Sequence, residues 1–117
     1  MPESVSNLVA WQKAMDLAHS IHRVTLHFPD HEERGMTTQL RRASVSVPSN
    51  IAEGRGRGSK RDFCHFLTQA RGSLYEVETQ VRLAADFKYI EQAQAKHILE
   101  DCDEVARLVN GLINSLR

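Results

Sequence analysis

A basic, glycine-rich stretch in the middle of the chain holds the residues most able to take part in chemistry. Between positions 41 and 61 there is a single acid, Glu53, and there are six basic residues: Arg41, Arg42, Arg55, Arg57, Lys60 and Arg61. The glycine-rich part leads into a helix predicted to begin at Ser59, where unbonded N–H groups and the helix dipole favour anions. The six basic residues are therefore candidate nucleic-acid-binding residues. The alternative is a solvated loop whose glycines only permit a turn.

This stretch does not match a known nucleotide-binding motif. A Walker loop carries Gly-Lys-Ser or Gly-Lys-Thr after a strand, whereas here Gly58-Ser59-Lys60 follows a predicted helix. Few aromatic residues accompany the basic ones, and the stacking of single-stranded bases depends on aromatic side chains. If nucleic acid binds, these residues favour a phosphate-directed, salt-sensitive contact. Arg41 and Arg42 either extend that surface or pair with the acidic last helix of the same or another copy.

The histidines and cysteines form no catalytic or metal-binding pattern. A di-metal site in a helical bundle uses Glu-x-x-His on two helices, and that motif is absent from the sequence. Cys64 and Cys102 fall on or beside apolar helical stripes, where thiols are usually inert. The sequence therefore predicts no catalytic residue, no metal site and no cofactor, and hence a protein that is not an enzyme.

The composition is that of a soluble domain with no net charge. The chain has 117 residues, 41% hydrophobic and 26% charged, with 15 basic and 15 acidic residues. This length fits a single domain, residues 1–117, with a core small enough to favour homo-oligomerisation. The N-terminus lacks the features of a secretory signal, and no run approaches the ~18 apolar residues of a membrane span. We expect a cytoplasmic protein with no membrane partner.

Apolar residues recur at steps of three and four throughout the chain, which predicts four helices and no strand. The expected helices span 7–28, 32–54, 59–87 and 91–116. The third has the most regular repeat: Phe63, Leu67, Ala70, Leu74, Val77, Val81 and Ala84. The stripe predicted for the fourth is Ala95, Ile98 or Leu99, Cys102, Val105, Val109, Leu112 and Leu116. Short connections between long helices predict an all-α, antiparallel up-down-up-down four-helix bundle.

Several local features should shape these helices. Asn7, Asp30 and Ser59 are the expected N-caps of the first three. In the second helix the apolar repeat continues in phase through Pro48, so we expect a kinked continuous helix rather than a break with a new turn capped by Ser49. Gly72, inside the third helix, is expected to permit close approach of a neighbouring backbone.

Three segments of the chain together form a family pattern. They are 9–14, 39–54 and 63–80, and the pattern is most specific where Pro48, Asn50 and Gly54 occur. It resembles the small four-helix bundle proteins encoded in 23S rRNA intervening sequences, which are related to the accessory protein of diversity-generating retroelements. The resemblance implies a homo-oligomeric ring, commonly a pentamer. Because that accessory protein acts beside a reverse transcriptase, the resemblance also supports a nucleic-acid hypothesis, but it implies no catalytic residue.

The sequence thus supports two hypotheses of function. The first is a non-enzymatic, homo-oligomeric bundle that offers a basic surface to RNA or to a ribonucleoprotein partner. The second is a protein–protein interaction scaffold with no nucleic-acid role, in which the basic residues meet acidic helix surfaces of neighbouring copies.

Overall fold

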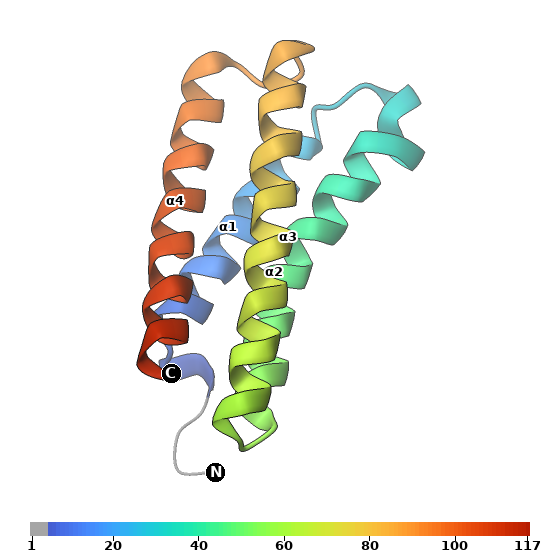
Figure 1. Ribbon diagram of the computed structural model, residues 1–117. Coiled ribbons are helices and arrows are strands. Elements are labelled where there is room, and N and C mark those ends of the chain that lie inside the picture. The colour runs from blue at the N-terminus through green and yellow to red at the C-terminus, as the bar shows by residue number, and fades with distance from the viewer. Residues whose placement is uncertain (1–4) are drawn as a thin grey trace.

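The computed structural model describes residues 5–117, which form four long α-helices and no strand. The elements are η1 (Val5–Asn7), α1 (Val9–Thr25), η2 (Asp30–Glu32), η3 (Glu33–Thr37), α2 (Thr38–Gly56), α3 (Lys60–Asp86) and α4 (Gln92–Ser115). The long helices run alternately up and down, so that the α2–α3 turn lies at one end of the bundle and the other two connections at the opposite end (Figure 1). The predicted all-α antiparallel bundle is confirmed.

The apolar repeat of α3 faces the core as predicted. Every residue of that repeat is buried: Phe63, Leu67, Ala70, Leu74, Val77, Val81 and Ala84. The helix also starts where expected, because the Ser59 hydroxyl accepts a hydrogen bond from the Asp62 N–H at 3.1 Å. In α4 the stripe needs one correction: Ile113 is buried, whereas Leu112 and Leu116 are only half-buried.

The predicted caps of the first two helices are wrong. Leu8, not Asn7, precedes α1 and makes no side-chain cap bond, because residues 5–7 form the short turn η1. Ahead of α2, Asp30 lies in η2, and the side chain of Glu32 caps η3, where its Oε1 accepts from the Met36 N–H at 3.2 Å. Thr37, the residue before α2, makes no side-chain cap bond. α2 itself begins later than predicted because of η3, in which Gly35 has non-helical dihedral angles.

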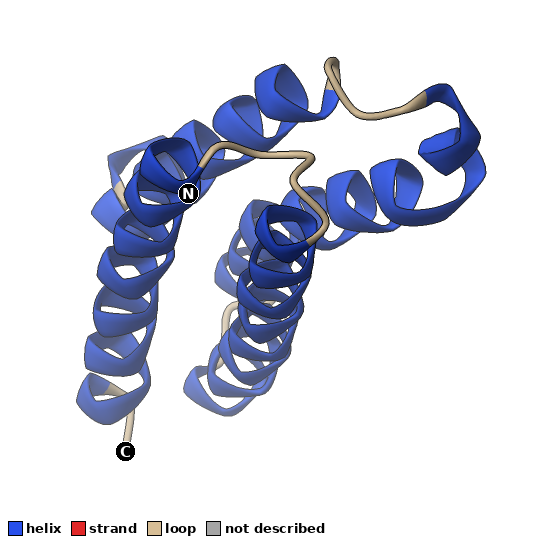
Figure 2. Ribbon diagram, turned by 90° about the horizontal axis from the view of Figure 1, so that it is seen from above, coloured by secondary structure: helices blue, strands red, loops and turns tan. Residues whose placement is uncertain are grey.

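Pro48 lies inside α2, which continues through it without a break. A new turn capped by Ser49 is therefore excluded, and the Ser49 hydroxyl instead donates to the Val45 carbonyl at 2.8 Å. The N-terminal part of α2 leans away from α3 in both views, as expected for a helix bent by an internal proline (Figures 1 and 2).

α2 and α3 approach each other most closely at Gly54, and not at Gly72 as the sequence suggested. A Cβ atom added to Gly54 would lie 2.7 Å from the Phe66 Cβ and 3.2 Å from the Phe63 carbonyl oxygen. One added to Gly72 would meet nothing within 4 Å. The glycine that the fold requires is therefore the one at the end of α2.

A small polar cluster joins the same two helices and accounts for Asn50. The Asn50 side-chain amide donates to the Ser46 carbonyl at 2.8 Å and to its hydroxyl at 2.9 Å. The Ser46 hydroxyl in turn lies 2.8 Å from that of Ser73 on α3. Asn50 thus satisfies polar groups at a helix–helix contact, which is an architectural role.

At the end of the bundle opposite the α2–α3 turn, Glu32 joins the α1–α2 connection to the α3–α4 connection. Its Oε2 accepts a hydrogen bond from the Tyr89 hydroxyl at 2.9 Å, in addition to the bond from Met36. Tyr89 also packs against Phe28, with 5.4 Å between ring centroids. The Met36 N–H, followed by the Tyr89 hydroxyl, lowers the pKa of Glu32, and the bond to the Glu32 carboxylate raises the pKa of Tyr89.

We expect Glu32→Gln to lower the midpoint of thermal unfolding at neutral pH, because an amide replaces a carboxylate that accepts two hydrogen bonds. A folded-state pKa below the unfolded value adds stability above the unfolded pKa and loses it as pH falls through the folded pKa. The difference in unfolding midpoint between wild type and Glu32→Gln should therefore become smaller as the pH is lowered toward about pH 3. Circular dichroism melts across this range measure it. The exposed Glu33→Gln is the control, and an equal shrinkage there would contradict the assignment.

Candidate nucleic-acid interface

The structure separates the six candidate basic residues into two groups. Arg41 and Arg42 lie near the start of α2, whereas Arg55 and Arg57 lie at its end, and Lys60 and Arg61 begin α3. About 14 residues of helix separate the groups, which corresponds to roughly 20 Å along the α2 axis. The basic stretch of the sequence therefore does not form one continuous patch.

Arg41 is engaged within the bundle. Its Nε donates to the hydroxyl of the buried Thr25 at 2.7 Å, and that hydroxyl donates to the Ile21 carbonyl at 2.7 Å. This chain ties α2 to the end of α1. Arg42 is exposed and lines a hollow between α2 and α3 together with Glu76.

The acidic residues of α4 find partners other than Arg41 and Arg42 in the described part of the chain. Glu104 lies 3.6 Å from the Lys13 ammonium, and Asp103 forms an ion pair with Arg107 one turn on. No ion pair among residues 5–117 joins α4 to either arginine at the start of α2. Pairing with α4 inside one copy is therefore not observed, while pairing between copies stays a prediction.

The α2–α3 turn brings the other basic residues together with aromatic rings. The Arg57 guanidinium lies 5.0 Å from the centroid of the Phe66 ring, and its Nε lies 3.2 Å from the Glu53 carboxylate. The His65 ring meets Phe66 edge to face, with 5.3 Å between centroids. Gly58, at φ +85°, makes the turn, in a conformation that glycine adopts most readily.

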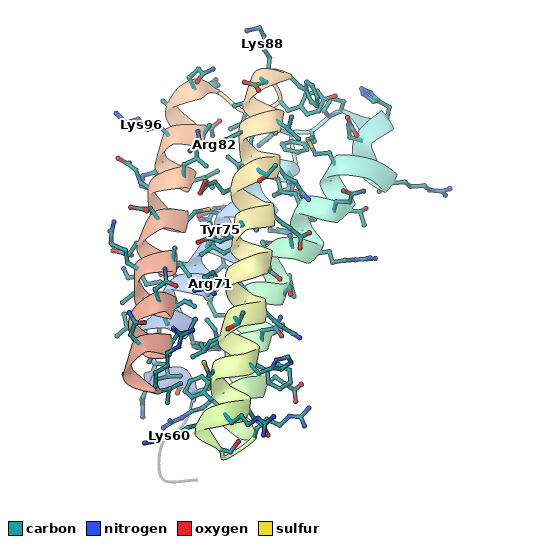
Figure 3. The ribbon with its side chains drawn as sticks, viewed as in Figure 1. Lys60, Arg71, Tyr75, Arg82, Lys88 and Lys96 are labelled. Atoms are coloured by element: carbon teal, nitrogen blue, oxygen red, sulfur yellow. The ribbon has the colours of Figure 1, made fainter. Side chains whose placement is uncertain are left out.

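This end of the bundle is suited to anions. Arg57, Lys60 and Arg61 are exposed, whereas Arg55 is half-buried. Ser59 caps only one of the first N–H groups of α3, and the start of a long helix carries a partial positive charge. Figure 3 shows Lys60 at this end of the molecule. The exposed basic side chains and the nearby Phe66 ring together offer charge and a surface for stacking.

Phe66 and His65 are the residues that sequence reasoning missed here. Phe66 lies outside the apolar repeat of α3 and is only half-buried. A large aromatic residue off the core face, five residues after Arg61, was the signal in the sequence. The surface is therefore less poor in aromatic side chains than composition suggested.

A second group of basic residues lies on the outer face of α3. Figure 3 shows Arg71, Tyr75 and Arg82 along this helix. Tyr75 is 53% exposed, Arg71 donates to the Asn110 side chain at 2.9 Å, and Arg82 lies 3.9 Å from the Glu78 carboxylate. Arg71, Tyr75 and Arg82 are separated by four and seven positions, a spacing that was visible in the sequence. Because Arg71 is half-buried and leaves Arg82 as the exposed cation of this group, this face is the weaker candidate.

The described residues contain no assembled catalytic centre of the metal or thiolate kind. No group of three or more metal-ligating side chains lies together in residues 5–117. Burial, the largest cause, raises the pKa of the Cys102 thiol to about 12, so it stays protonated and a poor nucleophile. The absence of enzyme activity stays a prediction. No helix within the same residues has the length and apolarity to span a membrane.

The fold and the surface define a small all-α bundle with a basic end, and comparison with known proteins gives its family. Residues 6–111 match the family model described as 23S rRNA-intervening sequence protein. The chain therefore belongs to the 23S rRNA-intervening sequence protein family, as the motif around Pro48 indicated.

One solved structure shows the same fold. It is a protein with unknown function from the S23 ribosomal protein family of Bacteroides thetaiotaomicron, 25% identical, with a TM-score of 0.84. The match covers 91% of this chain and 96% of that one. No curated protein matches the chain.

Proposed function

We propose that the protein is a non-enzymatic, cytoplasmic homo-oligomer that binds RNA phosphates through the α2–α3 end of the bundle. The observation that carries the proposal is the grouping of exposed Arg57, Lys60 and Arg61 at the α2–α3 turn, with the Phe66 ring 5.0 Å from the Arg57 guanidinium. Positions 53–66 contain four basic residues and two carboxylates, so this end has a local positive charge although the whole chain is neutral. Phosphate contacts of this kind supply affinity without base specificity.

Self-association would strengthen such binding. Several large apolar side chains remain more than 50% exposed, which favours burial against further copies: Val9, Leu26, Val45, Tyr75 and Phe87. A ring of several copies, commonly pentameric in proteins that the sequence resembles, would present several basic ends to one RNA. Linked weak sites then bind with higher overall avidity.

The test is fluorescence anisotropy with a labelled structured RNA. Replacing Arg57, Lys60 and Arg61 together by glutamine should weaken binding at least about tenfold, because each copy loses three phosphate contacts. The slope of the logarithm of affinity against the logarithm of salt concentration should become less steep by roughly two to three for each copy. The control replaces Arg34, Lys88 and Lys96, which carry the same total charge and are exposed outside both basic groups. Equal losses in the two variants, or no binding at low salt, would refute the proposal.

The interaction scaffold is the second candidate, and the exposure of Arg42 favours it. Arg42 has no ion pair among residues 5–117, whereas Glu100 on α4 is exposed and acidic. If these surfaces meet between copies, Arg42→Glu should lower the assembled mass in light scattering, and Glu100→Lys added to it should restore that mass. A mass unchanged by Arg42→Glu counts against the scaffold.

A further inference from the structure

The seam between α1 and α4 contains a row of three connected hollows. The middle one has a volume of about 500 Å³. It shares Ser20, Arg23 and His97 with the hollow on one side, and Val24, His27 and Gln94 with the hollow on the other. We call this row the α1–α4 groove. Its middle lies toward the end of the bundle opposite the α2–α3 turn, as the course of α1 and α4 shows (Figure 1).

The groove exists because small side chains face each other across the seam. Ser20 on α1 and Ala93 on α4 both line the middle hollow. Neither is large enough to cover the apolar residues beneath, Val24 and Ile98, which belong to the core. The floor of the middle hollow is therefore apolar, and its volume falls within the range of small-molecule sites.

The rim of the middle hollow carries one arginine and two histidines. Arg23, His27 and His97 line it, and no acidic residue among those described lines it with them. The Arg23 guanidinium donates to the Ser20 hydroxyl at 3.3 Å and forms no ion pair within residues 5–117. His97 is less available, because Asp101 lies 3.8 Å from its Nε2.

Among residues 5–117, the carboxylates that line the groove belong to the two flanking hollows, so the charge pattern changes along the groove. Asp16, Asp101 and Glu104 line one flank, and Glu91 lines the other. The Arg23 guanidinium is exposed and has no ion-pair partner within residues 5–117, so a bound anion would gain a charge-assisted hydrogen bond there. An anion is therefore favoured most in the middle hollow, beside Arg23 and His27 and away from the flanking carboxylates.

We propose that the α1–α4 groove binds a small amphiphilic anion, with a flat apolar body and one sulfonate, carboxylate or phosphate group. The apolar body lies against Val24, Ala93 and Ile98, and the anionic group accepts hydrogen bonds from Arg23 and His27. This site shares no residue with the α2–α3 end, and it assigns a small-molecule ligand to a protein proposed to bind RNA. The two functions are therefore separable by mutation.

The test uses the full chain and two fluorescent probes of nearly the same shape. Anilinonaphthalene sulfonate carries the anionic group, and N-phenyl-naphthylamine lacks it. We expect saturable binding of the sulfonate. Arg23→Gln should weaken the sulfonate about tenfold and leave the neutral probe unchanged, because only the charge-assisted contact is lost. Ala93→Trp, which fills the hollow, should weaken both probes.

Arg34→Gln is the control, because it removes an exposed arginine that lines none of the three hollows. It should leave both affinities unchanged. Absence of saturable sulfonate binding would overturn the proposal, as would equal weakening by Arg23→Gln and Arg34→Gln. If Ala93→Trp does not fold, Arg23→Gln still decides the question, since the Arg23 side chain is exposed and its hydrogen bond within residues 5–117 is the one to Ser20.

Discussion

Replacing Leu67 by alanine should destabilise the fold by about 2–5 kcal/mol, the largest effect that we expect of any single substitution considered. Leu67 is completely buried in the middle of the α3 repeat, between Phe63 and Ala70. Its truncation removes apolar contacts and leaves a cavity that closely packed helices fill only in part. A domain of this size has a total stability of about 5–15 kcal/mol, so the loss is a large share of it.

Urea unfolding followed by circular dichroism measures this difference. All variants are compared at one protein concentration, because self-association adds to apparent stability. Leu83→Ala on the same helix is the matched control, since Leu83 is 40% exposed and its truncation should change the free energy of unfolding by less than about 0.5 kcal/mol. Similar losses for the two leucines would mean that the buried and exposed faces of α3 are wrongly placed.

Gly54→Ala should also destabilise the protein, by roughly 1–3 kcal/mol. Its added methyl group would lie 2.7 Å from the Phe66 Cβ, and the Phe63 carbonyl oxygen at 3.2 Å prevents a simple shift away. In most helices the same substitution is favourable, because alanine restricts the unfolded chain. The expected sign therefore depends on the close contact between α2 and α3.

Gly72→Ala, on the neighbouring helix, should have the opposite effect on stability. Nothing lies within 4 Å of the added methyl group, so alanine should stabilise the fold by about 0.5–1 kcal/mol. Thermal and urea unfolding of the two variants, measured side by side, tests both signs. A stabilising Gly54→Ala would show that the two helices are less closely packed there than described.

Sequence reasoning worked best where a periodic pattern extends over several turns. The α3 repeat, the phase of the second helix through Pro48 and the Ser59 cap each involve neighbours in the sequence, and each is confirmed. Predictions failed where the outcome depended on a short irregular turn. The caps expected at Asn7 and Asp30 are displaced because η1 and η2 precede the helices.

The candidate site shows the same division. The sequence identified six basic residues but treated them as one stretch, whereas roughly 20 Å of α2 separates Arg41 and Arg42 from the rest. The sequence could not show that Arg41 donates a hydrogen bond to Thr25, since these residues belong to different helices. Nor could it show that the Phe66 ring lies under the Arg57 guanidinium.

The amino-acid sequence by itself determined the helical class, the positions of the long helices and the family. Helical periodicity, helix-breaking residues and the motif around Pro48 are properties of adjacent residues and need no three-dimensional contact. Only the tertiary structure decided which glycine permits close packing, which arginines remain exposed and where the α1–α4 groove lies. The physical reason is that each of these depends on how two helices pack together, and side chains far apart in the chain set that packing.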